Sequence, residues 1–185
     1  MFNIPNSITF SRILLIPVLV VVYIYDYRWS NVASAAIFAF AALTDWVDGY
    51  LARKLEQMSP FGAFLDPVAD KLMVATALIL LVFSQGENLF IVISSIVIIG
   101  REITISALRE WMAEIGKRGS VAVSYLGKVK TFAQMSAIAL LLYENDFMTL
   151  PIFDIGLVLL VAAAILTIIS MLIYLKAAWS VLKNH

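Results

Sequence analysis

The sequence predicts an all-α polytopic membrane protein, a bundle of six transmembrane helices with cytoplasmic N- and C-termini. Hydrophobic residues make up 62% of the 185 positions and charged residues only 14%, which leaves too little polar surface for a soluble domain of this length. Apolar runs follow one another from end to end, and nearly all basic residues fall on one side of them. No linker separates the runs, so residues 1–185 are expected to form a single domain.

Six apolar stretches are each close to the ~20 residues that a helix needs to cross a hydrocarbon core of ~30 Å. The third is short for this task, and the last is long enough to tilt or to extend into the cytosol. Polar breaks separate them at 26–30, 54–62, 84–88, 110–124 and 143–151. The predicted helices cover residues 8–25, 31–53, 67–83, 89–108, 125–142 and 152–178.

The first predicted helix contains Pro17, which removes a backbone donor and is expected to kink it. A cleaved signal peptide is the competing interpretation, with the small residues 33–35 as the cleavage site. Two features argue against cleavage: Arg12 lies within the apolar stretch, and residues 1–7 contain no lysine or arginine. We therefore expect this segment to remain as a membrane helix.

Basic residues predict the orientation of the bundle. With the helices placed as above, twelve of the 13 lysines and arginines fall on or near one side, and only Arg28 falls on the other. Cytoplasmic loops of membrane proteins carry an excess of these residues. Both termini and the second and fourth loops are therefore expected in the cytoplasm.

The residue types that are missing restrict the chemistry. The chain has no cysteine, which excludes disulfides and thiolate catalysis, and its single histidine is the last residue, His185. A metal site would therefore use oxygen ligands, which favours Mg²⁺, Mn²⁺ or Ca²⁺ over zinc or copper. The formal net charge is zero, and we expect no nucleic-acid partner.

Four aspartates stand at helical spacing around the second predicted loop. Asp45 and Asp48 are three residues apart and share one face of the second helix, and Asp66 and Asp70 are four apart on the third. Pro67 suits the first position of that helix, with Asp66 as its N-cap. A short loop makes the two helices antiparallel neighbours, so the four carboxylates are expected to converge at the cytoplasmic end of the bundle.

Four carboxylates crowded into a low-dielectric site repel one another unless protons or cations neutralise them. Lys71 and Arg53 would neutralise them only in part, whereas two divalent cations would balance all four charges. Such a metal pair also suits phosphoryl transfer, because it holds the attacking and the leaving oxygen. Packing alone does not explain four intramembrane acids at this spacing.

Small residues accompany the acids. Gly49, Ala52 and Gly62 would let a flat base or a diphosphate approach the backbone closely, although such residues are also typical of helix-packing contacts in membranes. Arg53 is placed to bind phosphate oxygens with its forked guanidinium. The pattern therefore indicates a site for a phosphorylated, nucleotide-like ligand beside the carboxylates.

The spaced motif resembles the complete signature of the CDP-alcohol phosphotransferase family, and the resemblance extends to the whole chain with its six helices. Every signature position is present and the eight-residue spacer matches. The motif is long, so a chance match is improbable. It reads Asp45-x2-Asp48-Gly49-x2-Ala52-Arg53-x8-Gly62-x3-Asp66-x3-Asp70.

The resemblance implies a mechanism. Two divalent metals, Mg²⁺ or Mn²⁺, would be bound by the four aspartates, and Asp70 would also act as general base on the hydroxyl of an acceptor alcohol. That oxygen would attack the β-phosphoryl group of a CDP-activated lipid, and CMP would leave. A homodimer is implied by analogy. The family positions that contact the CDP-lipid correspond to Gly49, Ala52, Arg53 and Ser59, and to the N-terminal element Asn6, Thr9 and Arg12.

A basic group on the same side as the carboxylates suggests the nature of the acceptor. Arg101 lies inside an apolar run, where a charge is costly and needs a partner. Glu102 is a poor candidate because adjacent helical residues point apart, whereas a phosphate on the acceptor would serve well. Lys117 and Arg118 are interpreted as ordinary topological charge. The acceptor-phosphate group is predicted to be Arg101, Arg109, Lys128 and Lys130.

Shorter strings resemble one branch of the family, the bacterial phosphatidylglycerophosphate synthases. This resemblance implies CDP-diacylglycerol and sn-glycerol 3-phosphate as substrates, among the lipids of a bacterial inner membrane, with phosphatidylglycerophosphate and CMP as products. The strings are residues 2–5, Arg101-Glu102, Arg109-Glu110-Trp111, and Gly127-Lys128-Val129-Lys130-Thr131 followed by Gln134.

Other functions stay open at this point. A cardiolipin synthase of the same family would use phosphatidylglycerol as acceptor, and inositol phosphate and serine are further family acceptors. A cation transporter would use the four aspartates as its ion path, but no acidic route leads to the opposite face. A structural or assembly protein would tolerate aspartate-to-asparagine changes without loss of function.

Overall fold

The computed structural model describes residues 4–25, 27–54, 60–115, 125–145 and 149–182. Within these ranges, some helical residues are described by their backbone alone. They are residues 4–6, 45–54, 60, 63, 125–126, 128, 177–178 and 180–182.

The described chain forms six α-helices, which confirms the predicted all-α class. Four of the helices contain segments long and apolar enough to cross a membrane, in α1, α3, α4 and α6, whereas α2 and α5 carry shorter apolar runs. The helices are α1 (Ile4–Ile24), α2 (Ser30–Lys54), α3 (Pro60–Ser84), α4 (Leu89–Glu114), α5 (Tyr125–Tyr143) and α6 (Ile152–Leu182).

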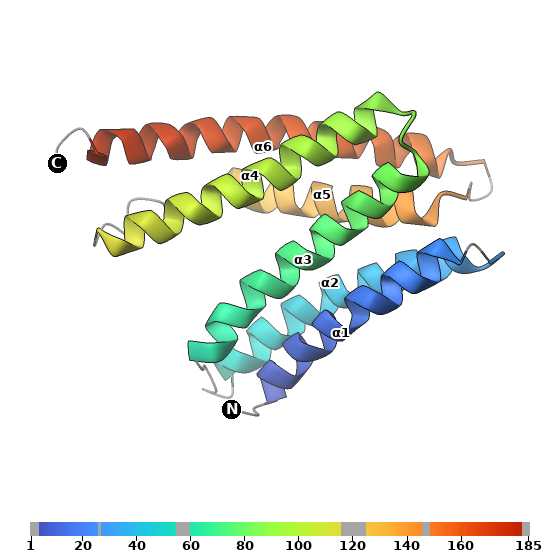
Figure 1. The fold of residues 1–185 in the computed structure, drawn as a ribbon, viewed down its shortest axis with the longest axis horizontal. Helices are drawn as coiled ribbons and strands as arrows, with labels where there is room; N and C mark the ends of the chain where they lie inside the picture. Colours follow the sequence, from blue (N-terminus) through green and yellow to red (C-terminus); the bar gives the residue numbers. More distant parts are fainter. Residues whose placement is uncertain (1–3, 26, 55–59, 116–124, 146–148, 183–185) are drawn as a thin grey trace.

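The helices form two groups that meet along α5 and between α3 and α4. Helices α1, α2 and α3 pack together, α4 and α5 both pack on α6, and α5 also contacts α2 (Figure 1). The first turn of α1 and the last turn of α6 lie at the same end of the bundle, together with the end of α2 and the start of α3. We call this the terminal end. The turns after α1, α3 and α5 lie at the opposite end.

Helix α1 begins at Ile4 and α6 ends at Leu182, each four residues beyond its predicted bound. Two other predicted boundaries were wrong by six or seven residues. Helix α3 begins at Pro60, so Asp66 is not an N-cap and Pro67 lies inside the helix. Pro60 itself occupies the favoured first position, and the missing donor of Pro67 affects only the bond to the carbonyl of Ala63. Helix α4 was predicted to end at residue 108, where the apolar run ends, but it continues to Glu114. The more polar residues after 108 therefore extend the helix and do not form a loop.

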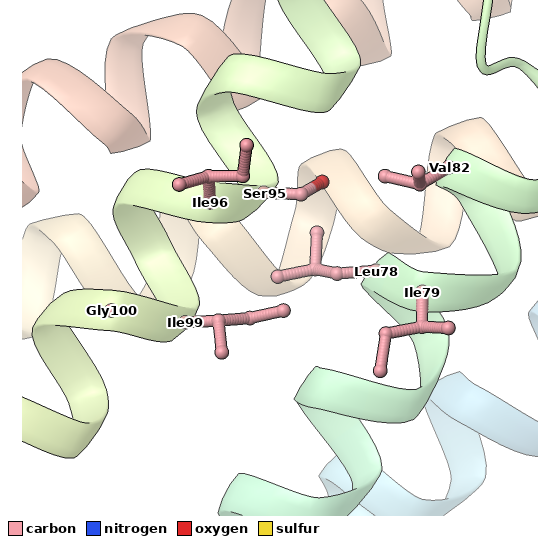
Figure 2. A pocket seen from close by; sticks show the side chains of 7 residues that line it. All are labelled: Leu78, Ile79, Val82, Ser95, Ile96, Ile99 and Gly100. Carbon is pink, nitrogen blue, oxygen red and sulfur yellow. The ribbon is translucent and has the colours of Figure 1, made fainter.

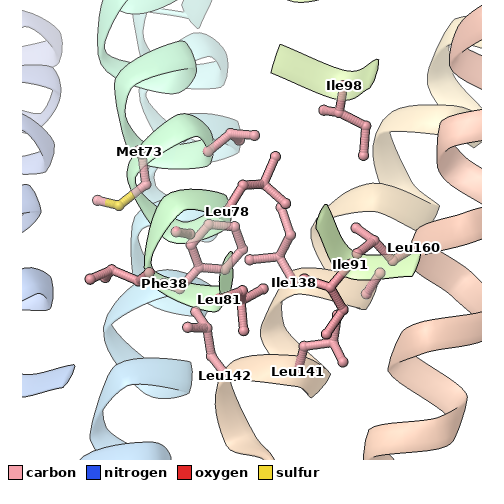
Figure 3. Packing of buried hydrophobic residues seen from close by; sticks show 14 of the residues in the cluster. Phe38, Met73, Leu78, Leu81, Ile91, Ile98, Ile138, Leu141, Leu142 and Leu160 are labelled. Carbon is pink, nitrogen blue, oxygen red and sulfur yellow. The ribbon is translucent and has the colours of Figure 1, made fainter. Parts of the chain in front are cut away.

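The centre of the bundle is an apolar core to which all six described helices contribute, α1 through Leu19 and Tyr23. Phe38 of α2, Leu78 of α3, Ile98 of α4, Ile138 of α5 and Leu160 of α6 are all nearly inaccessible (Figure 3). Many large apolar side chains are exposed on the outside instead. This distribution is required of a helical bundle in lipid, where helix association depends on packing and internal hydrogen bonds.

Glu144 connects three helices at the end opposite the terminal end. Its Oε1 accepts a hydrogen bond from Nε2 of Gln85 at 2.7 Å, and its Oε2 accepts one from Nδ2 of Asn31 at 3.1 Å. The residue follows α5 in a left-handed conformation, with φ of 59°. Such a conformation costs a non-glycine residue about 1 kcal/mol, so the two hydrogen bonds must outweigh this strain.

Glu144→Ala is expected to lower the free energy of unfolding by about 2 kcal/mol, because both hydrogen bonds to the carboxylate are lost. Thermal unfolding of the detergent-solubilised protein, compared with wild type, would measure this. Glu87→Ala is the matched control, since Glu87 is exposed in the neighbouring turn. Equal stability of the two variants would contradict a role for Glu144 in joining the helices.

Candidate active site

Two of the four predicted acids lie on α3, facing polar residues of α1. Thr9 Oγ1 donates to Asp66 Oδ1 at 2.5 Å, and Arg12 Nη1 donates to Asp70 Oδ1 at 2.6 Å. Arg12 Nη2 lies 3.9 Å from Asp66 Oδ1, so one guanidinium contacts both carboxylates. Sequence reasoning placed Thr9 and Arg12 in the site by resemblance only, and the structure brings both to the acids.

The two sides of this ion pair differ in exposure. The side chain of Arg12 is 1% exposed, whereas those of Asp66 and Asp70 are 41% and 45% exposed. A buried guanidinium in a membrane helix needs anionic partners, and these carboxylates provide them. The carboxylates are therefore held from one side by α1 and remain accessible from the other.

The second pair of acids lies on the last three turns of α2. The backbone of Asp45 and Asp48 is helical, which places the two residues on one face of α2. The end of α2 and the start of α3 lie at the same end of the bundle (Figure 1). Among the side chains that the structure describes, no three acidic or histidine residues converge as metal ligands. The carboxylate oxygens of Asp66 and Asp70 are nevertheless the donors that Mg²⁺ and Mn²⁺ prefer.

Several other predicted residues cannot be placed by their side chains. Ser59 lies outside the described residues. The rest belong to helices whose backbone is described without these side chains: Asn6, Gly49, Ala52, Arg53 and Lys128.

A cavity of about 730 Å³ lies between α2, α3, α4 and α5. Asp70 and Lys71 line it from α3, Glu102 from α4, and Lys130 and Gln134 from α5. The remaining wall is largely apolar, and among its residues Leu43 and Phe132 are also exposed on the outside of the bundle. The cavity therefore joins a polar region beside Asp70 to an apolar wall near the lipid-facing surface.

Glu102 is bound by two cations. Its Oε1 accepts from Arg101 Nη1 and from Lys130 Nζ, both at 2.8 Å. The expectation that Glu102 is a poor partner for Arg101 was therefore wrong, because the long arginine side chain folds back to its neighbour. Arg101 and Lys130, on different helices, are joined through one carboxylate.

Tyr174 of α6 joins Arg101 to a second arginine. The Cζ atoms of Arg101 and Arg109 lie 5.8 and 5.6 Å from the centre of its ring, within the range of cation–π attraction. Arg101 Nη2 also lies 3.4 Å from Ser170 Oγ, near the limit for a hydrogen bond. Three of the four predicted acceptor-phosphate residues thus form one connected group, and the fourth is Lys128.

A second recess, of about 400 Å³, lies between α3 and α4 (Figure 2). Its lining is apolar except for Ser95, and Ile79 and Ile96 are exposed there. It contains no charged residue. Of these two cavities, only the larger is lined by charged residues.

Sequence reasoning missed Glu102 and Tyr174 as members of the site. Glu102 had a usable signal, since an acid inside an apolar helix indicates a functional or paired group. Tyr174 had none, because a tyrosine in an apolar helix is common and its partners are about seventy positions away in the chain.

The fold and the site together define a protein of apolar, membrane-type helices, with acidic and basic side chains lining a largely apolar cavity. A family model for CDP-alcohol phosphatidyltransferases matches residues 2–179. The chain belongs to this family.

Several similar curated proteins carry the same name. A CDP-diacylglycerol–glycerol-3-phosphate 3-phosphatidyltransferase of Pseudomonas fluorescens is 54% identical over 184 residues, which cover 98% of this chain and 93% of that protein. The enzyme of the same name from Salmonella choleraesuis is 52% identical over 177 residues, covering 96% and 95%. That of Shigella flexneri is 51% identical over the same length.

Proposed function

We propose that this protein is a CDP-diacylglycerol–glycerol-3-phosphate 3-phosphatidyltransferase. It transfers the phosphatidyl group of CDP-diacylglycerol to sn-glycerol 3-phosphate, giving phosphatidylglycerophosphate and CMP in the synthesis of anionic phospholipids. One observation supports this most directly: Asp70 lines the same cavity as the Glu102–Lys130 pair, so a carboxylate base and an anion-binding group face one space.

Asp70 acts as the general base in this proposal. Its Oδ1 is fixed by Arg12, and the carboxylate takes the proton of the acceptor hydroxyl. The acceptor oxygen then forms a bond to the β-phosphorus, and the bond from that phosphorus to the bridging oxygen breaks. CMP leaves with the electrons of the broken bond.

Asp45, Asp48, Asp66 and Asp70 would hold two Mg²⁺ or Mn²⁺ ions. When bound, the metals neutralise the diphosphate and stabilise the charge that develops on the leaving CMP. Asn6, Gly49, Ala52, Arg53 and Ser59 are proposed to contact the CDP-lipid. Thr9 and Arg12, which are almost completely buried, are proposed to support its binding by holding Asp66 and Asp70.

The cavity suggests how the two substrates meet. Its apolar wall, with Leu43 and Phe132 at the outer surface, suits acyl chains that enter sideways from the bilayer. The group of Arg101, Arg109, Lys128 and Lys130 attracts the anionic acceptor and holds its phosphate. In this arrangement Glu102 keeps Arg101 and Lys130 paired in the absence of acceptor.

The topology proposal follows from the charges. We place all six helices across a bacterial inner membrane, with the terminal end in the cytoplasm, since the sequence predicts twelve of the 13 basic residues on or near this side. The water-soluble acceptor would then arrive from the cytosol. A homodimer is proposed by analogy with other family members.

Release of CMP by the purified protein tests the function. The assay would contain CDP-diacylglycerol, Mg²⁺ and one acceptor at a time: glycerol 3-phosphate, phosphatidylglycerol, inositol phosphate or serine. We expect release only with glycerol 3-phosphate, and phosphatidylglycerophosphate as the lipid product. Release only with a different acceptor would support the proposed phosphatidyl transfer but reject glycerol 3-phosphate as the acceptor. No release from folded protein would favour the cation transporter.

A further inference from the structure

Gln134 occupies an unusual position on the buried face of α5. It lies one helical turn after Lys130, so the two side chains share a face, and both line the large cavity. Further along the same face, Ala137, Ile138 and Leu141 belong to the apolar core. Lys130 and Gln134 are therefore the polar start of a stripe that is otherwise apolar.

The amide of Gln134 is incompletely satisfied. The residue is 4% exposed, and no donor among the described residues reaches its Oε1. Lys130 at the preceding turn is 3% exposed but donates to Glu102. A buried acceptor without a donor is destabilising, and in native proteins it commonly marks a place that a ligand or a water completes.

The chemistry of the proposed substrates restricts which group completes it. The diacylglycerol part of the lipid contains only esters, and its diphosphate is ionised, so neither offers a hydrogen to the amide oxygen. The acceptor carries two hydroxyls. One of them is the nucleophile at Asp70, and the other, on the middle carbon, is a free donor.

The positions of the surrounding groups fit this donor. In the proposed function, the acceptor phosphate lies at the group containing Lys130 and the reacting hydroxyl lies at Asp70. The middle carbon then lies between them, inside the cavity that Gln134 lines. The CDP contacts are proposed for Asn6, Gly49, Ala52, Arg53 and Ser59 instead.

We propose that Gln134 is a specificity residue that accepts a hydrogen bond from the secondary hydroxyl of the acceptor. This inference rests on the proposed function. It predicts that the enzyme distinguishes glycerol 3-phosphate from 3-hydroxypropyl phosphate, which keeps the primary hydroxyl and the phosphate but lacks the secondary hydroxyl. Without that hydroxyl the Oε1 atom of Gln134 still lacks a hydrogen-bond donor, so kcat/KM for 3-hydroxypropyl phosphate should be lower.

The test measures kcat/KM for both acceptors in the wild type and in Gln134→Met, a variant of similar size without the amide. We expect wild type to prefer glycerol 3-phosphate by about 10- to 100-fold. Gln134→Met should lose this preference, with the loss confined to glycerol 3-phosphate and KM for CDP-diacylglycerol unchanged. Gln134→Glu, which keeps an acceptor oxygen, should retain the preference.

The comparison is a ratio within each preparation, so the amount of folded enzyme cancels. Ser136→Ala is the control, because Ser136 lines the same cavity; its preference should equal that of wild type. Equal use of both acceptors by wild type would overturn the inference, as would an unchanged preference in Gln134→Met. If wild type does not use glycerol 3-phosphate at all, the proposed function itself fails.

Discussion

Asp70→Asn is expected to reduce CMP release by about 1,000-fold or more, because an amide cannot take the proton of the acceptor hydroxyl and is a weaker metal ligand than a carboxylate. The fold should survive. Asparagine keeps a side-chain oxygen that can accept the hydrogen bond that Arg12 Nη1 donates to Asp70 Oδ1 at 2.6 Å in the wild type. Steady-state CMP release, measured beside thermal unfolding of the same preparation, separates the two effects.

Asp154→Asn is the matched control for this change. Asp154 is an exposed acid in the first turn of α6, at the end of the bundle opposite the site. Its replacement should leave turnover unchanged. A folded and fully active Asp70→Asn protein would contradict the assignment of Asp70 as the base, whatever the acceptor.

The ion pair with Arg12 gives Asp70 a defined orientation. Because Arg12 is almost completely buried, its guanidinium has little freedom to move. It holds the Asp70 carboxylate from the α1 side, and Asp70 lines the cavity. Asp66 is held by Thr9 in the same way. Preorganised groups of this kind reduce the rearrangement that a reaction requires.

The positions of the helices, and the grouping of the acids on one face of each helix, were predictable because both depend on local sequence pattern. Apolar runs of membrane-spanning length reveal helices directly, and i, i+3 and i, i+4 spacing places Asp45 with Asp48 and Asp66 with Asp70. The start of α3 was not predictable in this way, since Pro60 and Pro67 both suit a first helical position. The prediction began the helix at Pro67, whereas Pro60, seven positions earlier, occupies its first position.

The contacts between helices were outside the reach of sequence reasoning. Arg12 and Asp70 are 58 positions apart, and nothing local indicates that they meet. The same is true of Tyr174 with its two arginines and of Glu144 with Asn31. The unpaired oxygen of Gln134 depends on the absence of a donor in the packed interior, which only the assembled bundle reveals.

Arg101→Met is expected to reduce kcat/KM for glycerol 3-phosphate by about 100-fold, since it removes a buried cation that we propose contacts the acceptor phosphate. The effect should appear as a higher KM for glycerol 3-phosphate, with KM for CDP-diacylglycerol unchanged. Titrating each substrate in the CMP-release assay measures both. The fold should persist because Glu102 keeps Lys130 as a partner, so no buried charge is left unpaired.

Arg101→Lys should restore only part of this loss, because the arginine makes three different contacts. One nitrogen donates to Glu102, a second lies near Ser170, and the guanidinium lies by the ring of Tyr174. A lysine ammonium cannot reproduce this fork. Lys176→Met, which removes an exposed cation of α6, is the control and should leave KM unchanged. A normal KM for glycerol 3-phosphate in Arg101→Met would reject the phosphate site at Arg101 while leaving the carboxylate chemistry intact.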